Sequence, residues 1–207
     1  MVRIAAQKLG IPESQLEFRG DGVYSLDGTL KMTRFDIATK SMAGNSIPVE
    51  VTVSHCSPFS PPPFMAGMAE VEVDTETGSV EVLNYASVVD PGTAINPNLV
   101  KVQAEGGIVQ GIGMTLHENI TYNKEGRLME NSFMQYKVPT RLDMGRLHTE
   151  IESSYEETGP YGAKSVGEVV INTPAPAIAH AIFRATGVWH RELPITPERV
   201  LRSMHHD

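Results

Sequence analysis

Apolar and polar residues alternate most regularly in two neighbouring segments, "AEVEVD" (69–74) and "SVEVLNYASVVD" (79–90). A period of two residues is typical of strands that bury one face. The segment "TETG" between them ends in a glycine, so the pattern predicts an antiparallel hairpin. Valines at every second position of 49–53 predict a further strand.

Four prolines fall within "SPFSPPPF" (57–64), between these predicted strands. Proline lacks a backbone donor, so this segment cannot be a central strand. Two interpretations remain. The segment is either an extended surface loop or an arm, held extended by its prolines, that packs on a partner chain.

The first residues predict a short amphipathic helix, "VRIAAQKL" (2–9), which Gly10 ends and Pro12 seals. Brief extended pieces follow over 16–42, separated by Gly-Asp-Gly and Asp-Gly turn signals. A domain that opens on a helix with no preceding sheet is unusual. We therefore expect the chain to continue from structure that is supplied elsewhere.

A longer helix is predicted to open at Asn96-Pro97, because apolar residues recur at roughly helical spacing from Val100 to Leu116. Four glycines interrupt this helix, and each costs roughly 1 kcal/mol relative to alanine. This cost needs an offset, which either close approach of a bulky ligand or tight packing on neighbouring protein would provide. The glycines stand at positions 106, 107, 111 and 113.

The remaining elements are a hairpin turn at 123–128, a strand at 147–156 and two helices. The first helix has Thr173 as its expected N-cap and a body over 174–186, and the second begins at Pro197. No internal repeat and no low-complexity tract interrupts this order.

Composition places the chain among globular proteins, because 41% of its 207 residues are hydrophobic and 20% are charged. We expect one domain over 1–207, in which 1–65 is the least defined part. The net charge of −8 argues against a nucleic-acid partner. The sequence shows no apolar run long enough to cross a membrane and no signal-peptide core, and its single cysteine, Cys56, excludes an internal disulfide. We therefore expect a soluble cytoplasmic protein.

Standard catalytic motifs are absent from the sequence, which has no GxGxxG, GxxxxGK[ST], HExxH or GxSxG pattern. The histidines are scattered, and His180 in the predicted C-terminal helix is interpreted as a satisfied polar residue. Hydrolase and mononucleotide-binding functions therefore lack support.

Two segments carry the remaining chemistry: "QAEGGIVQGIG", which opens on Gln103, and "GAKSVGE". Gly162 and Gly167 would let the second segment expose its backbone amides to an anion or a polar heterocycle. Glu168 follows them, and the next residues are almost wholly uncharged. In an enclosed, apolar setting a carboxylate is suited to act as a general base near pH 7. The alternative is an acid that complements the dipole of a helix N-terminus.

Together with "VVDPGTAINPNLVKV", these segments resemble the C-terminal part of the molybdenum-binding subunit of the xanthine dehydrogenase family of molybdenum hydroxylases. The family includes aldehyde oxidoreductases, carbon monoxide dehydrogenases and nicotinate dehydrogenases. The hairpin before them and the closing "LPITPERV" are similar to the family's as well, so the resemblance covers the whole chain, most weakly over 1–65. It implies an α+β fold with mixed sheets and packed helices.

The resemblance also implies a cofactor, a molybdenum-pyranopterin in its cytosine dinucleotide form, whose dithiolene holds the metal without a direct protein ligand. Glu168 stands where the family has the glutamate that takes the proton of molybdenum-bound hydroxide. The oxygen then attacks an electron-poor carbon of a heterocycle or aldehyde, while hydride moves to a sulfido ligand. Gln103 stands where a glutamine hydrogen-bonds the pterin. The loop backbone would border the cofactor at Lys164, Ser165, Val166 and Gly167.

In the family this region is only the last portion of a longer subunit. The resemblance therefore implies a hetero-oligomer with the upstream half as a separate chain, on which residues 1–65 would pack. Iron–sulfur and flavin subunits would carry [2Fe-2S] and FAD, and the chain alone would be inactive. Purines, other N-heterocycles, aldehydes and carbon monoxide all remain open as small-molecule substrates. The alternatives are a non-catalytic interaction subunit that keeps the fold, and an inert truncated fragment without molybdenum.

Overall fold

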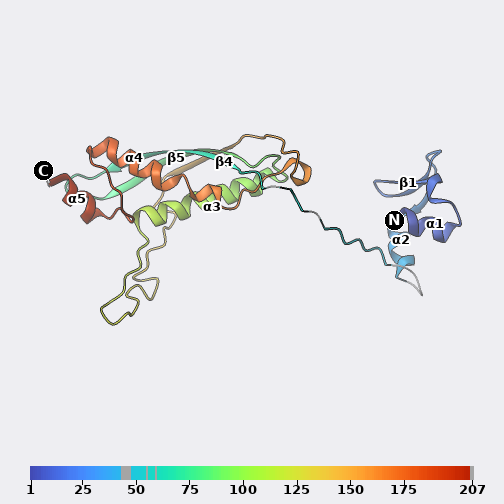
Figure 1. The fold of residues 1–207 in the computed structure, drawn as a ribbon, viewed down its shortest axis with the longest axis horizontal. Helices are drawn as coiled ribbons and strands as arrows, with labels where there is room; N and C mark the ends of the chain where they lie inside the picture. Colours follow the sequence, from blue (N-terminus) through green and yellow to red (C-terminus); the bar gives the residue numbers. More distant parts are fainter. Residues whose placement is uncertain (43–47, 55, 59, 206–207) are drawn as a thin grey trace. The chain divides into compact units, whose positions relative to one another are not determined.

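Two compact units make up the chain, residues 1–56 and residues 57–207, and each has a hydrophobic core of its own (Figure 1). Their boundary falls at the start of the proline-rich segment. The single domain expected over 1–207 stays a prediction. The residues that this computed structural model describes are 1–42, 48–54, 56–58 and 60–205.

The first unit combines two helices with a three-stranded antiparallel sheet. The helix predicted at 2–9 is confirmed, as are short strands between residues 16 and 33. Residues 34–41 were expected among the extended pieces and instead form a second helix, so that part of the prediction is wrong. Gly10 ends the first helix with a left-handed φ of 67°. Thr33 begins the second, because its hydroxyl accepts a hydrogen bond from the backbone N–H of Asp36 at 3.1 Å. The elements are α1 (Val2–Leu9), η1 (Glu13–Gln15), β1 (Leu16–Arg19), β2 (Gly22–Ser25), β3 (Leu30–Thr33) and α2 (Arg34–Ser41). The hydrophobic core of this unit is formed by the buried residues Ile4, Ala5, Ala6, Leu16, Val23, Met32 and Ile37.

The strand predicted at 49–53 is wrong, because residues 48–54 take no strand conformation. The side chains of Val51 and Val53 are 84% and 80% exposed. Alternation favours a strand only where an apolar surface receives its inward face, and no such surface covers these valines within the described residues. The described proline-rich residues that follow are irregular until a strand begins at Phe64.

The second unit is a three-stranded sheet with two long helices packed against it (Figure 1). Its elements are β4 (Phe64–Val73), β5 (Val80–Asp90), α3 (Pro97–Leu116), β6 (Arg146–Ile151), η2 (Pro160–Gly162), η3 (Val169–Ile171), α4 (Pro174–Thr186) and α5 (Pro197–His205). β5 lies in the middle of the sheet, antiparallel to β4 in the predicted hairpin and parallel to β6. α3 contacts β6, α4 contacts β4, and the two helices contact each other.

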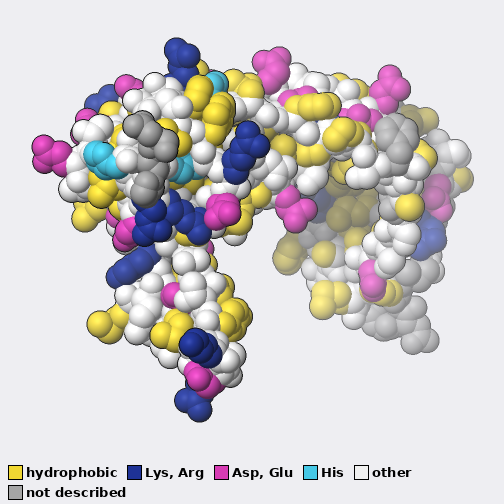
Figure 2. Space-filling model, turned by 60° about the vertical axis from the view of Figure 1, so that its left-hand side comes forward, with side chains coloured by type: hydrophobic (Ala, Val, Ile, Leu, Met, Phe, Trp, Pro, Cys, Tyr) yellow, Lys and Arg dark blue, Asp and Glu magenta, His cyan; other side chains and the backbone are white. Residues whose placement is uncertain are grey.

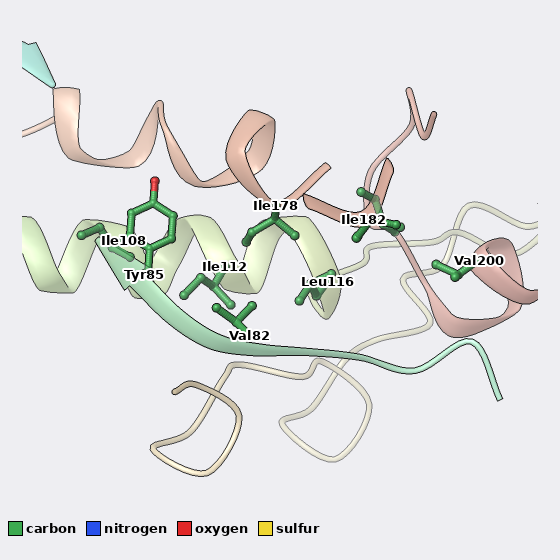
Figure 3. Packing of buried hydrophobic residues seen from close by; sticks show 9 residues of the cluster. Val82, Tyr85, Ile108, Ile112, Leu116, Ile178, Ile182 and Val200 are labelled. Atoms are coloured by element: carbon green, nitrogen blue, oxygen red, sulfur yellow. The ribbon is translucent and has the colours of Figure 1, made fainter. Parts of the chain in front are cut away.

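The core of the second unit lies between β5, α3 and α4 (Figure 3). Tyr85 is its largest fully buried side chain, and its hydroxyl donates a hydrogen bond to Oγ1 of Thr173 at 2.9 Å. Thr173 therefore ties the start of α4 to the sheet, and the cap hydrogen bond expected of its side chain is not made. The other buried residues of this cluster are Val82, Ile108, Ile112, Leu116, Ile178, Ile182, Ile195 and Val200.

Packing inside this unit explains three of the four glycines of α3. A Cβ at Gly107 would overlap the side chain of Val170 in η3, and a Cβ at Gly111 would lie 2.6 Å from the ring of Pro174. Gly113 is similarly crowded. At these positions the cost of glycine in the helix is offset by tight packing on protein, one of the two predicted explanations.

The turn predicted at 123–128 is confirmed by the bridge between Tyr122 and Leu128. The strand predicted at 147–156 is shorter, since β6 ends at Ile151. Beyond this end, the hydroxyl of Ser154 donates to the carboxylate of Asp90 at 2.8 Å. Among the described helices, none combines the length and the hydropathy that crossing a membrane requires.

Candidate functional site

The two segments singled out in the sequence lie side by side in the second unit. α3 contacts η3 along part of its length. The side-chain amide of Gln103 in α3 donates a hydrogen bond to the backbone carbonyl of Gly167 at 2.9 Å. The structure therefore brings Gln103 and the loop before Glu168 together, although they are far apart in the sequence.

This contact separates two hollows in the surface. One has a volume of about 270 Å³, lies between α3 and η3, and is lined by Glu168 and Gln110 among others. The other has a volume of about 370 Å³ and lies beside the turn that follows β5, where Thr93 and Lys164 line it. Gln103 and Gly167 line both hollows. A ligand that occupied either hollow would touch these two residues.

Two glycines, Gly106 and Gly167, line the smaller hollow, and no contact within the described protein requires glycine at either position. A Cβ at Gly106 or at Gly167 would meet no atom within 4 Å, and neither residue has a positive φ. Gly167 was expected, with Gly162, to let the loop expose its backbone amides, but it does so without a left-handed φ. A side chain at either position would instead fill space in the hollow. The pair forms an open floor onto which a flat group could pack closely.

An ion pair holds the loop onto the end of β5. The ammonium of Lys164 lies 2.6 Å from the carboxylate of Asp90, and the two side chains are only 6% and 20% exposed. The backbone N–H of Lys164 also donates to the carbonyl of Pro91 at 2.7 Å. Asp90 accepts further hydrogen bonds from the hydroxyl of Ser154 and the amide of Gly92. The position of the loop therefore depends on this aspartate.

The surroundings of Asp90 favour its charged form. Burial alone would raise the pKa of its carboxyl, but the hydrogen bonds from Lys164, Ser154 and the Gly92 amide outweigh burial and lower the pKa to about 2. Sequence reasoning missed this pair. The only signal was an aspartate at the end of a predicted strand, and no local spacing joins it to Lys164.

The backbone of the loop is partly unusual and partly unpaired. Gly162 has a left-handed φ of 84°, as expected, and Tyr161 before it has a φ of 55°, which is rare for a residue with a side chain. In the part of the chain that the structure describes, the N–H groups of Ser165, Val166 and Gly167 donate no hydrogen bond. Consecutive unpaired amides of this kind suit a polar or anionic ligand.

Glu168 lies at the rim of the smaller hollow and is exposed. Its enclosure was expected from the uncharged residues that follow, but these turn inward as η3 and α4. Val170, for example, is buried against α3. The side chain of Glu168 makes no cap hydrogen bond to η3. Within the described residues, its carboxylate has neither a hydrogen-bond partner nor an ion-pair partner.

The donor set of the site suits a cofactor held by hydrogen bonds. Among the described residues, no group of three or more His, Cys, Asp or Glu side chains could hold a metal ion directly. The open floor at Gly106 and Gly167, the unpaired loop amides and the amide of Gln103 instead match the polar edges and flat face of a pterin. The residues present therefore fit the implied cofactor, with the metal carried by the cofactor itself.

Comparison with known proteins points the same way. The model of the molybdopterin cofactor-binding domain family matches residues 1–145. The probable hypoxanthine oxidase XdhD of Escherichia coli (strain K12) is 35% identical over 202 residues, which are 96% of this chain and 21% of XdhD. The chain thus spans about a fifth of the length of this curated relative.

Solved structures share the fold. A Cu,Mo-CO dehydrogenase matches with a TM-score of 0.77 and 24% identity, over 98% of this chain and 26% of its own. Quinoline 2-oxidoreductase from Pseudomonas putida 86 matches with a TM-score of 0.74 and 24% identity, over 98% and 27%. The expected α+β fold with mixed sheets and packed helices is confirmed.

Proposed function

Because the chain belongs to the family of molybdopterin cofactor-binding domains found in xanthine dehydrogenase-type oxidoreductases, we propose that it supplies the catalytic base and part of the cofactor site of a molybdenum hydroxylase. The reaction is the hydroxylation of an electron-poor carbon of a heterocycle or aldehyde, with water as the source of oxygen. The cofactor is the pyranopterin in its cytosine dinucleotide form. When bound, its molybdenum accepts the two electrons of the oxidation.

One observation carries this proposal: Glu168, an exposed carboxylate without a partner among the described residues, stands at the rim of a hollow with an open glycine floor. In the proposed reaction Glu168 takes the proton of the attacking oxygen. Gln103 holds Gly167 and thereby orients the loop that carries this base. The backbone that borders the cofactor runs through Lys164, Ser165, Val166 and Gly167.

The rest of the enzyme comes from other polypeptide. The chain spans 21% of XdhD, so the covering wall of the site and most of the substrate pocket are assigned to the upstream part of the molybdenum subunit. Partner subunits carry [2Fe-2S] and FAD, and the hetero-oligomer works in the cytoplasm. This arrangement also accounts for the exposure of Glu168 in the chain taken by itself, and the chain alone is inactive.

The test is Glu168→Gln in the complex of this chain with the upstream polypeptide. Glutamine keeps the size of the side chain but cannot take a proton, so kcat should fall by about 10²–10⁴-fold while molybdenum content stays near that of the wild type. The matched control is Glu157→Gln, which changes an exposed carboxylate outside the hollow. Turnover of Glu168→Gln at the wild-type rate would refute the assignment. A wild-type complex without molybdenum would instead favour the non-catalytic interaction subunit.

A further inference from the structure

A long projection leaves the body of the second unit between α3 and β6 (Figure 1). We call residues 118–143 the finger. All of these residues are described, they form no helix or strand of their own, and not one of them is buried. Connections of this length without secondary structure are uncommon in compact domains, and they are usually either functional, as lids and binding loops are, or disordered linkers.

The finger is nevertheless ordered by its own hydrogen bonds. The carboxylate of Glu130 accepts from the backbone and hydroxyl of Thr121 at 2.6 and 2.7 Å. Near its root, the hydroxyl of Tyr136 donates to the carboxylate of Glu118. These bonds give the finger a defined shape without any core of its own. It therefore presents a preformed surface rather than a loose loop.

That surface exposes several large apolar side chains. Figure 2 shows hydrophobic side chains on the projection at the lower left of the view, with charged side chains between them. Phe133, Met134 and Leu142 are 85%, 81% and 91% exposed. Charges of both signs are spread between them in near balance. The other exposed large apolar residues of the finger are Ile120, Tyr122, Leu128, Met129 and Val138.

Exposed apolar side chains that gather on one segment are characteristic of surfaces that contact another protein, a membrane or a ligand. We infer that the finger is the docking element for the upstream part of the molybdenum subunit. This inference rests on the proposed function for the identity of the partner. The chain accounts for only 21% of XdhD, so a much larger polypeptide is available to cover the finger.

Two features favour this partner over a second copy of the chain. First, each copy has a net charge of −8, which disfavours self-association. Second, the finger begins directly after α3, the helix that carries Gln103 and Gly106 to the cofactor hollow. A polypeptide that binds the finger is therefore held beside α3, the helix that lines the cofactor hollow which this polypeptide must complete.

The experiment uses the complex of the full chain with the upstream polypeptide. Phe133→p-benzoylphenylalanine is introduced, the complex is irradiated, and cross-linked peptides are identified by mass spectrometry. Cross-links to the upstream polypeptide are expected. Cross-links to a second copy of the chain, or no cross-links at all, would overturn the inference.

Affinity is measured in parallel with the double variant Phe133→Ser, Leu142→Ser. The double variant should weaken binding of the upstream polypeptide at least 10-fold, because apolar anchors carry most of the energy of such contacts. The matched control, Lys124→Ser, changes an exposed charge on the same finger and should stay within about twofold of the wild type. The thermal unfolding midpoint of the chain should be the same in both variants, since these side chains are exposed. Equal binding by the double variant and the control would overturn the inference.

Molybdenum content and turnover separate the two proposals. A complex that assembles through the finger but lacks molybdenum refutes the proposed function and leaves the interface standing. Suppose instead that the complex has normal molybdenum content and turnover, and that the finger variants do not change its assembly. This result refutes only the inference that the finger is the docking element.

Discussion

At the scale of single residues, the loop before Glu168 is held in place by charge. Lys164 buries its ammonium against Asp90 at 2.6 Å, and the same aspartate collects hydrogen bonds from Ser154 and Gly92. A buried pair of this kind is costly to break on one side, because the remaining charge stays buried without compensation. The base proposed for the reaction is thus positioned by a pair that takes no part in the chemistry.

We predict that Asp90→Asn destabilises the second unit by about 3–5 kcal/mol at pH 7. The pKa of the Asp90 carboxyl is lowered from its ordinary value of 3.8 to about 2. Folding therefore favours the ionised form, and its contribution, about 2 kcal/mol, is complete above pH 4 and lost as pH falls from about 4 to about 2. The free energy of unfolding of wild type and variant, measured against pH, should converge by that amount over this window.

Ser154→Ala provides the comparison for this prediction. It removes one hydrogen bond to Asp90 but leaves the ion pair with Lys164 intact. The loss should be about 1.5–3 kcal/mol, the range for a hydrogen bond to a charged group, and smaller than that of Asp90→Asn. A free-energy difference between wild type and Asp90→Asn that is the same at pH 2 and pH 7 would show that this ion pair does not carry the effect.

At the scale of elements, regular patterns predicted the structure well. Alternation predicted the β4–β5 hairpin, and the Asn96-Pro97 signal predicted the start of α3, where the side chain of Asn96 accepts from the N–H of Leu99. Where a predicted element is wrong, tertiary contacts determine the observed conformation. The valines of 49–53 have the strand period but meet no apolar surface in the described residues.

The candidate site was only partly predictable, because it too depends on tertiary contacts. Gln103 and Glu168 were found from the glycine pattern and the family resemblance. Their meeting through the Gln103–Gly167 hydrogen bond, and the ion pair of Asp90 with Lys164, join positions 64 and 74 residues apart. No local periodicity reports contacts over such separations.

The glycines of α3 give an element-scale prediction. Gly106→Ala should stabilise the chain by about 1 kcal/mol, because alanine favours the helix and its Cβ would meet no atom within 4 Å. Gly107→Ala should destabilise it, because the same Cβ would overlap Val170. Both are measured as free energies of unfolding of the chain.

The second readout of this pair is the molybdenum content of the complex. If a flat cofactor packs on the glycine floor, Gly106→Ala should lower that content although the chain itself is more stable. Unchanged molybdenum in a stabilised Gly106→Ala complex would exclude close packing of the cofactor at this position.

At the scale of the whole molecule, the described residues form separate hydrophobic clusters, one in the first unit and two in the second. Ile37 lies in the core of the first unit and Ile112 in the main core of the second, and among the described residues the two clusters share no member. Small cores of this kind leave little margin of stability, so loss of one buried side chain is a large perturbation within its unit.

We predict that Ile37→Ala and Ile112→Ala act in different units. Each should cost about 2–5 kcal/mol, through lost burial and the cavity left behind. Hydrogen exchange should show Ile37→Ala accelerating amides of the first unit while those of α3 keep their wild-type rates, and Ile112→Ala should do the reverse. Because cooperative units open separately where their buried contacts are separate, faster exchange in α3 of the Ile37→Ala chain would mean that residues 1–207 unfold as the single domain expected from the sequence.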